Sequence, residues 1–175
     1  MKFNVLHVPK VLLYEPFQLW SEEECQNLID RAKDKLDKAR VYHHHDPKDV
    51  RTNDVSWVEL TESEKNYCWE IVKPFWEIVT WFEHPVQVSR YQKDQFYEWH
   101  RDSKPGIKRS SIRYLTLTCT LKKAPGATFE LKNRIYDLNV GEAVIFPSKI
   151  DHRANPPIDQ ERWAFTIWYM QPNNK

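Results

Sequence analysis

The segment SRYQKDQFYEWHRD, Ser89 to Asp102, is the stretch around which we expect the rest of the chain to be organised. It ends in His100-Arg-Asp102. Residues i and i+2 of an extended strand point to the same face, so the imidazole of His100 and the carboxylate of Asp102 are expected to converge. A third candidate ligand, His152, lies downstream, followed by Arg162 in a strand-like run. Two histidines and a carboxylate that leave open positions suit a redox-active divalent metal ion.

Length and composition indicate a single domain of 175 residues that can bury a genuine core. The formal net charge is +1 and the charges are interspersed, which argues against nucleic acid or an anionic membrane as an obligatory partner. Cys25, Cys68 and Cys119 show no CxxC spacing, which favours reduced, buried thiols over disulfides. We find no signal peptide and no segment of transmembrane length. We therefore expect a cytoplasmic protein, as a monomer or dimer.

Two helices are predicted in the N-terminal half. Each begins with a capping box, Ser21-Glu-Glu-Glu24 and Thr61-Glu-Ser-Glu64. Apolar residues then recur with the helical period. The two stripes are Cys25, Leu28, Ile29, Ala32 and Leu36, and Tyr67, Cys68, Ile71, Val72, Phe75, Trp76 and Val79. Pro74 lies inside the second stripe and is expected to kink that helix.

The remainder is predicted to be mainly β-structure. Expected strands are Phe3–Val8, Val11–Tyr14, Val55–Leu60, Val86–Tyr91, Ser111–Leu121, Thr128–Leu131, Ala143–Phe146 and Trp163–Met170. Within Arg113–Leu121, apolar residues alternate with threonines, so one face should pack on helices and the other should line a polar cavity. Turns are expected at Pro105-Gly106, Pro125-Gly126 and Val140-Gly141-Glu142. Helices followed by many short strands indicate a β-sandwich or barrel with N-terminal helices packed on one sheet.

The order of several motifs extends this interpretation. The His-x-Asp pair is preceded by VRTNDVSW (Val50–Trp57) and followed by RYLTLTCTL (Arg113–Leu121), GATFEL (Gly126–Leu131) and GEAVIFPS (Gly141–Ser148). His152 comes four residues after the last of these motifs, Arg162 ten after that histidine, and Trp168 six further on. In this order the chain resembles the 2-oxoglutarate- and Fe(II)-dependent dioxygenases, and within them the prolyl 4-hydroxylase branch.

The resemblance implies a double-stranded β-helix, or jelly roll, over residues 85–171, supported by a helical region, 1–84. It implies Fe(II) and 2-oxoglutarate, with ascorbate as a candidate reductant, and hydroxylation of a prolyl residue in a peptide or protein by O2, with release of succinate and CO2. Arg162 would hold the distal carboxylate of 2-oxoglutarate, because guanidinium is a planar, permanently charged fork. The expected catalytic metal ligands are His100, Asp102 and His152. The expected cosubstrate residues are Arg162, Tyr91, Thr120 and Trp168, and the expected substrate residues are Arg51, Trp57, Tyr97 and Arg113.

The sequence departs from the family pattern at two turns. Asp94 stands where the family usually has glycine, although aspartate tolerates the left-handed backbone better than most residues. Pro125-Gly126 replaces a pair of glycines. Neither change affects a proposed ligand. The polar loop 41–53 contains three adjacent histidines, which in regular structure cannot all face one ion. We interpret it as solvated, and as a candidate lid over a bound peptide.

Other functions remain open. The same chemistry could act on a free amino acid, a small metabolite or a nucleobase. Nucleic-acid dealkylases usually carry a second arginine at the position of Trp168, which disfavours the nucleobase. A catalytically silent cupin-like binding module would be free to lose the triad. Structural zinc is usually four-coordinate, which fits three ligands poorly.

Overall fold

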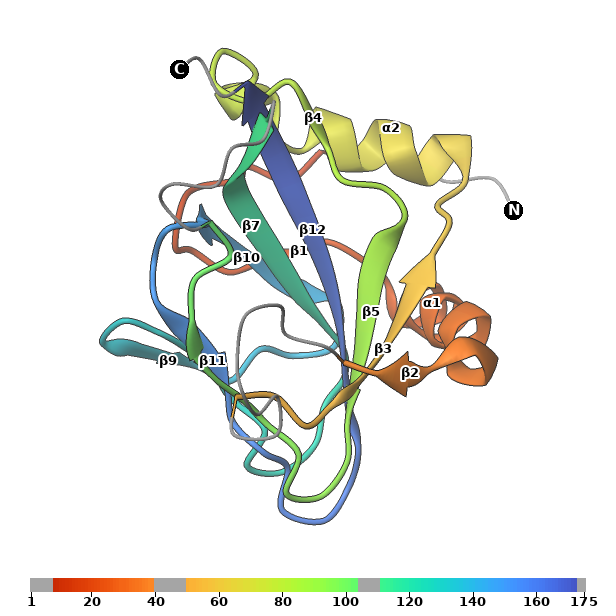
Figure 1. Ribbon diagram of the computed structural model, residues 1–175. Helices are drawn as coiled ribbons and strands as arrows, with labels where there is room; N and C mark the ends of the chain where they lie inside the picture. The colour runs from red at the N-terminus through yellow and green to blue at the C-terminus, as the bar shows by residue number, and fades with distance from the viewer. Residues whose placement is uncertain (1–7, 40–49, 104–110, 173–175) are drawn as a thin grey trace.

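The computed structural model describes residues 8–39, 50–103 and 111–172. They form two antiparallel sheets with helices on one side (Figure 1). The larger sheet has the spatial order β1 (Phe17–Gln18), β10 (Glu142–Pro147), β7 (Ser111–Lys122), β12 (Arg162–Pro172), β5 (Val86–Tyr91), β3 (Asp54–Val58) and β2 (Asp37–Lys38), and β4 (Trp81–Phe82) pairs with β12. The smaller sheet has the order β6 (Tyr97–His100), β11 (His152–Ala154), β8 (Phe129–Leu131) and β9 (Arg134–Tyr136). This confirms the predicted double-stranded β-helix fold with supporting helices.

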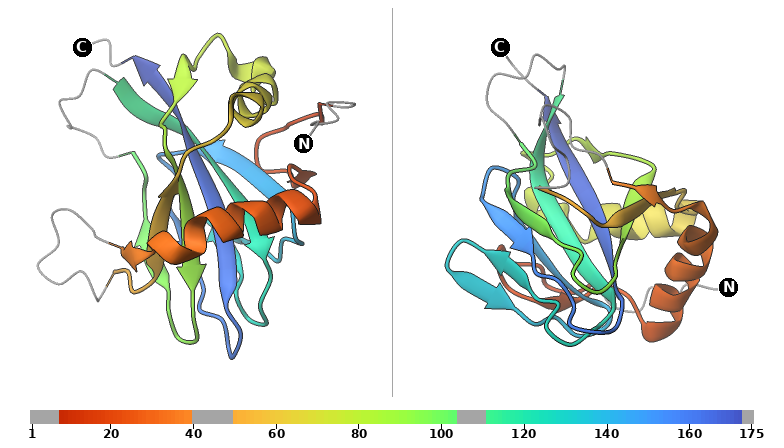
Figure 2. Two further views of the ribbon diagram at one scale, coloured as in Figure 1. Left: turned by 90° about the vertical axis from the view of Figure 1, so that its right-hand side faces the viewer. Right: turned by 60° about the horizontal axis from the view of Figure 1, so that its bottom comes forward.

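The two predicted capping boxes start the two helices. α1 (Glu22–Ala32) is capped by Ser21 and α2 (Glu62–Glu70) by Thr61, and each cap exchanges hydrogen bonds with the glutamate three residues later. α1 lies across the larger sheet (Figure 2, left) and contacts β3, β5 and β7. Its apolar stripe is buried there. Burial of this face gives the helix most of its stability, because short isolated helices are marginal in water.

The predicted second helix is too long. α2 ends at Glu70, and Lys73–Phe75 forms a separate 3₁₀ turn in which Pro74 occupies the first turn. Proline has no backbone N–H and crowds the preceding turn, so it starts a new turn here instead of kinking a continuous helix. A similar short turn, Lys33–Lys35, follows α1.

The N-terminal half contributes strands as well as helices. β1, β3 and β4 pair with β10, β5 and β12 respectively, so the region preceding residue 85 completes the larger sheet. The strand expected at Val11–Tyr14 is wrong, because Leu13 and Tyr14 form a turn and Tyr14 has a positive φ of 67°. The strand expected from Phe3 falls almost wholly outside the described residues, and so does most of the loop 41–53.

β7 separates the core from a cavity, as its alternation predicts. Leu115, Leu117, Cys119 and Leu121 belong to the main hydrophobic cluster, together with residues of both helices. Thr116 and Thr118 face the other way and line a cavity between the two sheets. Such alternation places every second side chain on one side of a strand.

Two of the three predicted turns, at Gly126 and Gly141, have the expected backbone, whereas Pro105-Gly106 lies outside the described residues. Gly126 and Gly141 have φ values of 78° and 80°, and Asp94 has a φ of 62°. At Gly141 a Cβ atom would collide with the carbonyl of Trp20, so this turn also requires glycine for space. All three cysteines are buried and free, as expected. The described residues contain no helix long and apolar enough to cross a membrane.

Candidate active site

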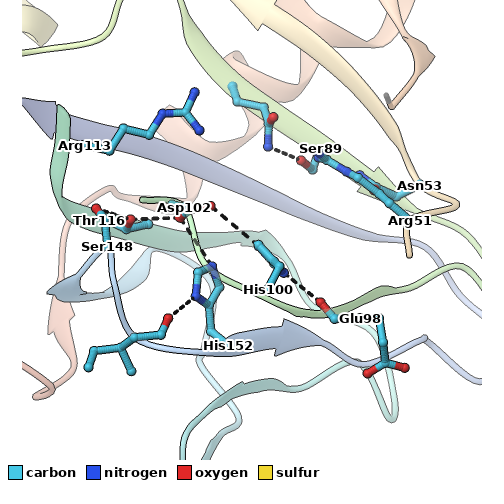
Figure 3. Close-up of polar contacts among 12 residues, drawn as sticks. Arg51, Asn53, Ser89, Glu98, His100, Asp102, Arg113, Thr116, Ser148 and His152 are labelled. Atoms are coloured by element: carbon cyan, nitrogen blue, oxygen red, sulfur yellow. Dashed lines mark hydrogen bonds and ion pairs between the residues drawn. The ribbon is translucent and has the colours of Figure 1, made fainter. Parts of the chain in front are cut away.

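Three side chains that could bind a metal converge at one end of the cavity (Figure 3). The ligand atoms of His100, Asp102 and His152 all lie within 4.8 Å of one another. Asp102 Oδ1 is 3.6 Å from Nε2 of His100, and Oδ2 is 3.3 Å from Nε2 of His152. The sequence therefore identified residues that the fold brings together.

The route by which these residues meet differs from the prediction. His100 is the last residue of β6, and Asp102 lies beyond the strand, so strand alternation does not align the two. Instead the backbone N–H of Asp102 donates to the carbonyl of Ser148 at 3.0 Å. His152 begins β11 and lies directly opposite His100 in the register of the smaller sheet. β11 itself was not predicted, because three residues are too few for a recognisable alternation.

Both imidazoles are oriented by backbone carbonyls. Nδ1 of His100 lies 2.7 Å from the carbonyl oxygen of Glu98, and Nδ1 of His152 lies 2.8 Å from that of Ile150. These contacts place a proton on Nδ1 of each imidazole, so Nε2 is the nitrogen that faces Asp102 and is the one available to a metal. This is how a histidine ligand is usually held in metal sites.

The carboxylate is held by hydroxyl groups that the sequence reasoning missed. Thr116 Oγ1 donates to Asp102 Oδ2 at 2.8 Å and also lies 2.8 Å from Oγ of Ser148. Ser148 ends the GEAVIFPS motif and is fully buried. One signal for this contact was present in the sequence: Thr116 lies on the threonine face of its strand, and that face was predicted to line a cavity.

The electrostatics keep the carboxylate ionised and one imidazole neutral. Burial opposes ionisation of Asp102, but His152 and His100 outweigh it and hold the pKa of Asp102 well below its usual range. Burial, with the neighbouring His152, lowers the pKa of His100 to about 3. Burial also acts against protonation of His152, but Asp102 prevails and raises the pKa of His152. A buried carboxylate flanked by two imidazoles, each of which turns Nε2 toward it, is a donor set that a divalent cation fits once it displaces any proton from His152.

Tyr97 and Arg51 stack behind His100. The Tyr97 ring is nearly parallel to the His100 ring, with 3.4 Å between centroids, and the guanidinium of Arg51 lies 4.3 Å from the Tyr97 centroid. Burial raises the pKa of Tyr97 to about 12, so its hydroxyl is neutral. Arg51 Nε donates to Oδ1 of Asn53 at 2.7 Å. Of the four predicted substrate residues, Tyr97 thus contacts a proposed metal ligand directly, and Arg51 reaches the site only through Tyr97.

The other end of the cavity contains an uncompensated cation. Arg162 is only 2% exposed. Within the described ranges, no group accepts a hydrogen bond from its guanidinium and no carboxylate pairs with it. Tyr91, its partner in the register of β5 and β12, has its ring centroid 5.5 Å away. Because a buried charge is costly unless paired, this end of the cavity fits the carboxylate of a ligand.

The space between the lining residues amounts to about 450 Å³, a figure that includes the open mouth of the cavity. Tyr91, Tyr97, Arg162 and Trp168 line it, together with the three candidate ligands. Thr120, predicted to face the cosubstrate, is buried but lies outside the lining, whereas Thr118 is part of it. The sequence reasoning also missed Gln87 and Ser89, which line the cavity and are joined by a 3.0 Å hydrogen bond.

The two other predicted substrate residues lie beside Trp168. The guanidinium of Arg113 is 3.7 Å from the Trp168 ring centroid and pairs with Glu83 at 2.7 Å. Trp57 is 49% exposed, with its ring centroid 6.2 Å from that of Trp168. Neither is part of the cavity lining. Both could reach only a substrate that extends beyond the cavity.

Comparison with known proteins supports this interpretation of the site. Residues 86–170 match the family model of the 2OG-Fe(II) oxygenase superfamily. A protein of Acanthamoeba polyphaga mimivirus, named "Putative prolyl 4-hydroxylase", is 27% identical over 177 aligned positions, which cover 85% of this chain and 69% of the viral protein.

Solved structures share the fold. The viral collagen prolyl hydroxylase of Paramecium Bursaria Chlorella virus-1, in complex with 2-oxoglutarate, superposes with a TM-score of 0.73 at 20% identity, over 91% of this chain and 97% of that one. A prolyl hydroxylase of Trichoplax adhaerens, in complex with a peptide fragment of hypoxia inducible factor, superposes with a TM-score of 0.62 at 17% identity, over 85% and 76%.

Proposed function

We propose that this protein is a member of the 2OG-Fe(II) oxygenase superfamily, whose family model residues 86–170 match, and that it hydroxylates prolyl residues of a peptide or protein substrate. One observation carries the proposal. A His-Asp-His cluster and an unpaired, buried arginine line the same cavity. The first fits a divalent metal, and the second fits the free carboxylate of a 2-oxo acid that also reaches the metal.

The metal would be held by Nε2 of His100, Nε2 of His152 and the carboxylate of Asp102. When bound, Fe(II) with 2-oxoglutarate and O2 supplies the oxidation that inserts one oxygen atom into a C–H bond, and succinate and CO2 are released. The chain itself contributes orientation. The carbonyls of Glu98 and Ile150 keep both Nε2 atoms free, and Thr116 binds one carboxylate oxygen of Asp102.

Arg162 would anchor the distal carboxylate of 2-oxoglutarate with a bidentate pair of charge-assisted hydrogen bonds. The hydroxyl of Tyr91, which lies beside Arg162 in the cavity lining, could add a third. Thr118 is the threonine best placed for this role, in place of the predicted Thr120. The cosubstrate would thereby replace the missing counter-ion of a buried guanidinium.

A peptide substrate is favoured by the relatives and by the rim. The mimivirus protein and both structural neighbours are named as prolyl hydroxylases, and one neighbour is in complex with a peptide. Near the cavity, Trp57 is half-exposed beside Trp168 and offers an aromatic surface, and Tyr97 and Trp168 are part of the cavity lining. Aromatic-lined surfaces suit proline-rich, extended peptides. Three free, buried cysteines support the further proposal of a reducing, cytoplasmic location.

The test is an anaerobic loading of the protein with Fe(II), followed by addition of 2-oxoglutarate, O2 and a library of proline-containing peptides. Mass spectrometry should detect the gain of one oxygen on proline, with one succinate released per hydroxylation. His152→Ala is the matched control and should show neither product. Succinate release without any modified peptide would refute the prolyl substrate and favour a small molecule. Absence of succinate under all conditions would refute the enzyme class.

A further inference from the structure

An ion pair outside the cavity connects the segments that carry the metal site. Arg101 lies between His100 and Asp102, and Asp151 directly precedes His152. Nε and one terminal nitrogen of Arg101 donate to the two carboxylate oxygens of Asp151 at 2.8 and 2.9 Å. The two side chains are 51% and 49% exposed. Neither belongs to the cavity lining, so neither contacts the metal or the cosubstrate.

The strand register explains why these two residues meet. His100 is paired with His152 in the antiparallel ladder of β6 and β11, so the next opposing positions are 101 and 151. Both histidines line the cavity, whereas Arg101 and Asp151, which lie just beyond the ends of the two strands, are outside its lining. Cross-strand pairs of opposite charge stabilise such a ladder.

The ladder itself ends at the ligands. β6 stops at His100 and β11 starts at His152, and the register of the pair is irregular between His152 and Ala154. The last backbone pairing of the two strands is therefore also the pairing that sets the distance between two proposed ligands. Strand ends are the least stable part of a ladder. The Arg101–Asp151 pair extends the contact by one position beyond this end.

We propose that Arg101 and Asp151 are positioning residues for the metal site, which keep His100 and His152 at the separation that a shared ion needs. This inference rests on the proposed function of the His-Asp-His cluster. Its expected effect is modest, because Asp102 is tethered separately to Ser148 and the Tyr97 ring still supports His100. Loss of the pair should weaken metal binding about two- to fivefold.

The experiment is a titration of metal-free protein with Co(II), without 2-oxoglutarate, followed by visible absorption and by competition with a chelator. Arg101→Ala and Asp151→Ala should each raise the Kd for Co(II) by that factor. The charge reversal Arg101→Asp with Asp151→Arg should restore the wild-type Kd. High salt should bring the wild type toward the single variants, because an exposed pair is screened. Melting temperatures of the metal-free proteins should change little.

Arg134→Ala is the matched control. Arg134 is also an exposed arginine of the smaller sheet, and it pairs with Glu15 at 3.2 Å, away from the ligands. It should leave the Kd for Co(II) unchanged. The proposal is overturned if both single variants bind Co(II) like the wild type, if the charge reversal recovers nothing, or if Arg134→Ala weakens binding equally. Wild-type protein that binds Co(II) but never releases succinate would refute the proposed function and leave this comparison intact.

Discussion

Replacing Arg162 by Met should make the ligand-free protein more stable and its cosubstrate binding far weaker. Methionine matches the length of the arginine stem but has no charge. Arg162 is 2% exposed and has no ion-pair partner among the residues described, and its burial lowers the pKa of its guanidinium. In the absence of cosubstrate it is therefore a destabilising group retained for its ligand, a trade-off between stability and function.

The expected magnitudes follow from burial and geometry. A fully buried, unpaired ion costs several kcal/mol, but this one borders a cavity that water can enter. We therefore expect Arg162→Met to gain about 1–2 kcal/mol, or roughly 2–8 °C in melting temperature for a chain of this size. Loss of two charge-assisted hydrogen bonds, at about 1.5–3 kcal/mol each, should weaken 2-oxoglutarate binding more than about a hundredfold. Arg162→Lys keeps the charge and should lose about ten- to a hundredfold.

The assay compares melting temperatures with and without 2-oxoglutarate, in the presence of Mn(II) and without O2, together with calorimetric titration of the cosubstrate. Saturating ligand should stabilise the wild type by about 2.7 kcal/mol at a hundred times its Kd, and should not stabilise Arg162→Met. Arg90→Met is the control. Arg90 lies on the adjacent strand and is paired with Asp54 at 2.9 Å, so its removal should lower the melting temperature and leave cosubstrate affinity unchanged.

Two results would refute this reasoning. If Arg162→Met lowers the melting temperature of the ligand-free protein, as Arg90→Met does, then the guanidinium is compensated by the fold. If 2-oxoglutarate binds Arg162→Met as tightly as the wild type, another residue holds its distal carboxylate.

Three further outcomes are expected. Alanine at His100, Asp102 or His152 should abolish succinate release and metal binding but leave the circular dichroism spectrum largely unchanged; a variant that still binds Fe(II) and turns over would remove that residue from the ligand set. Thr116→Val removes the hydroxyl that donates to Asp102 and should weaken metal binding about tenfold, whereas an unchanged Kd in a metal titration would show that this contact does not orient the carboxylate. Burial acts to raise the pKa of Asp54, but the hydrogen bonds from Lys38 and Arg90 prevail and lower it. The ionised carboxylate therefore stabilises the fold fully above its unfolded pKa of about 3.9. This stabilisation decreases as the pH falls toward the lower pKa of Asp54 in the folded protein. Urea unfolding should therefore show a shallower loss of stability between pH 6 and pH 3 in Asp54→Asn than in the wild type, and parallel curves would contradict that.

Local features of the fold could be predicted from the sequence because their causes lie within a few residues. A capping box involves four consecutive residues, so Ser21 and Thr61 could be identified directly. The alternation along β7 needs only the two-residue period of a strand. The predicted continuation of α2 through Pro74 was wrong for a reason that is also local: the apolar stripe continued, but the backbone could not.

The candidate ligands and Arg162 were identified by their residue types and order, but their geometry depends on contacts between distant segments. The pairing of His100 with His152 joins positions 52 apart, and the Thr116–Asp102–Ser148 network joins three segments. Thr118 and Thr120 lie on the same face of β7 by alternation, and only the tertiary structure shows that Thr118 lines the cavity whereas Thr120 lies outside its lining.

The sequence by itself determined the residue types of the site, the helix starts and the strand periodicity, because propensity, capping and alternation act between near neighbours. Only the tertiary structure decided which carbonyls orient the two imidazoles, that Arg162 has no counter-ion in the described fold, and that Arg101 meets Asp151 behind the ligands. These features depend on cross-strand register and burial, which arise when segments far apart in the chain pack together and exclude water.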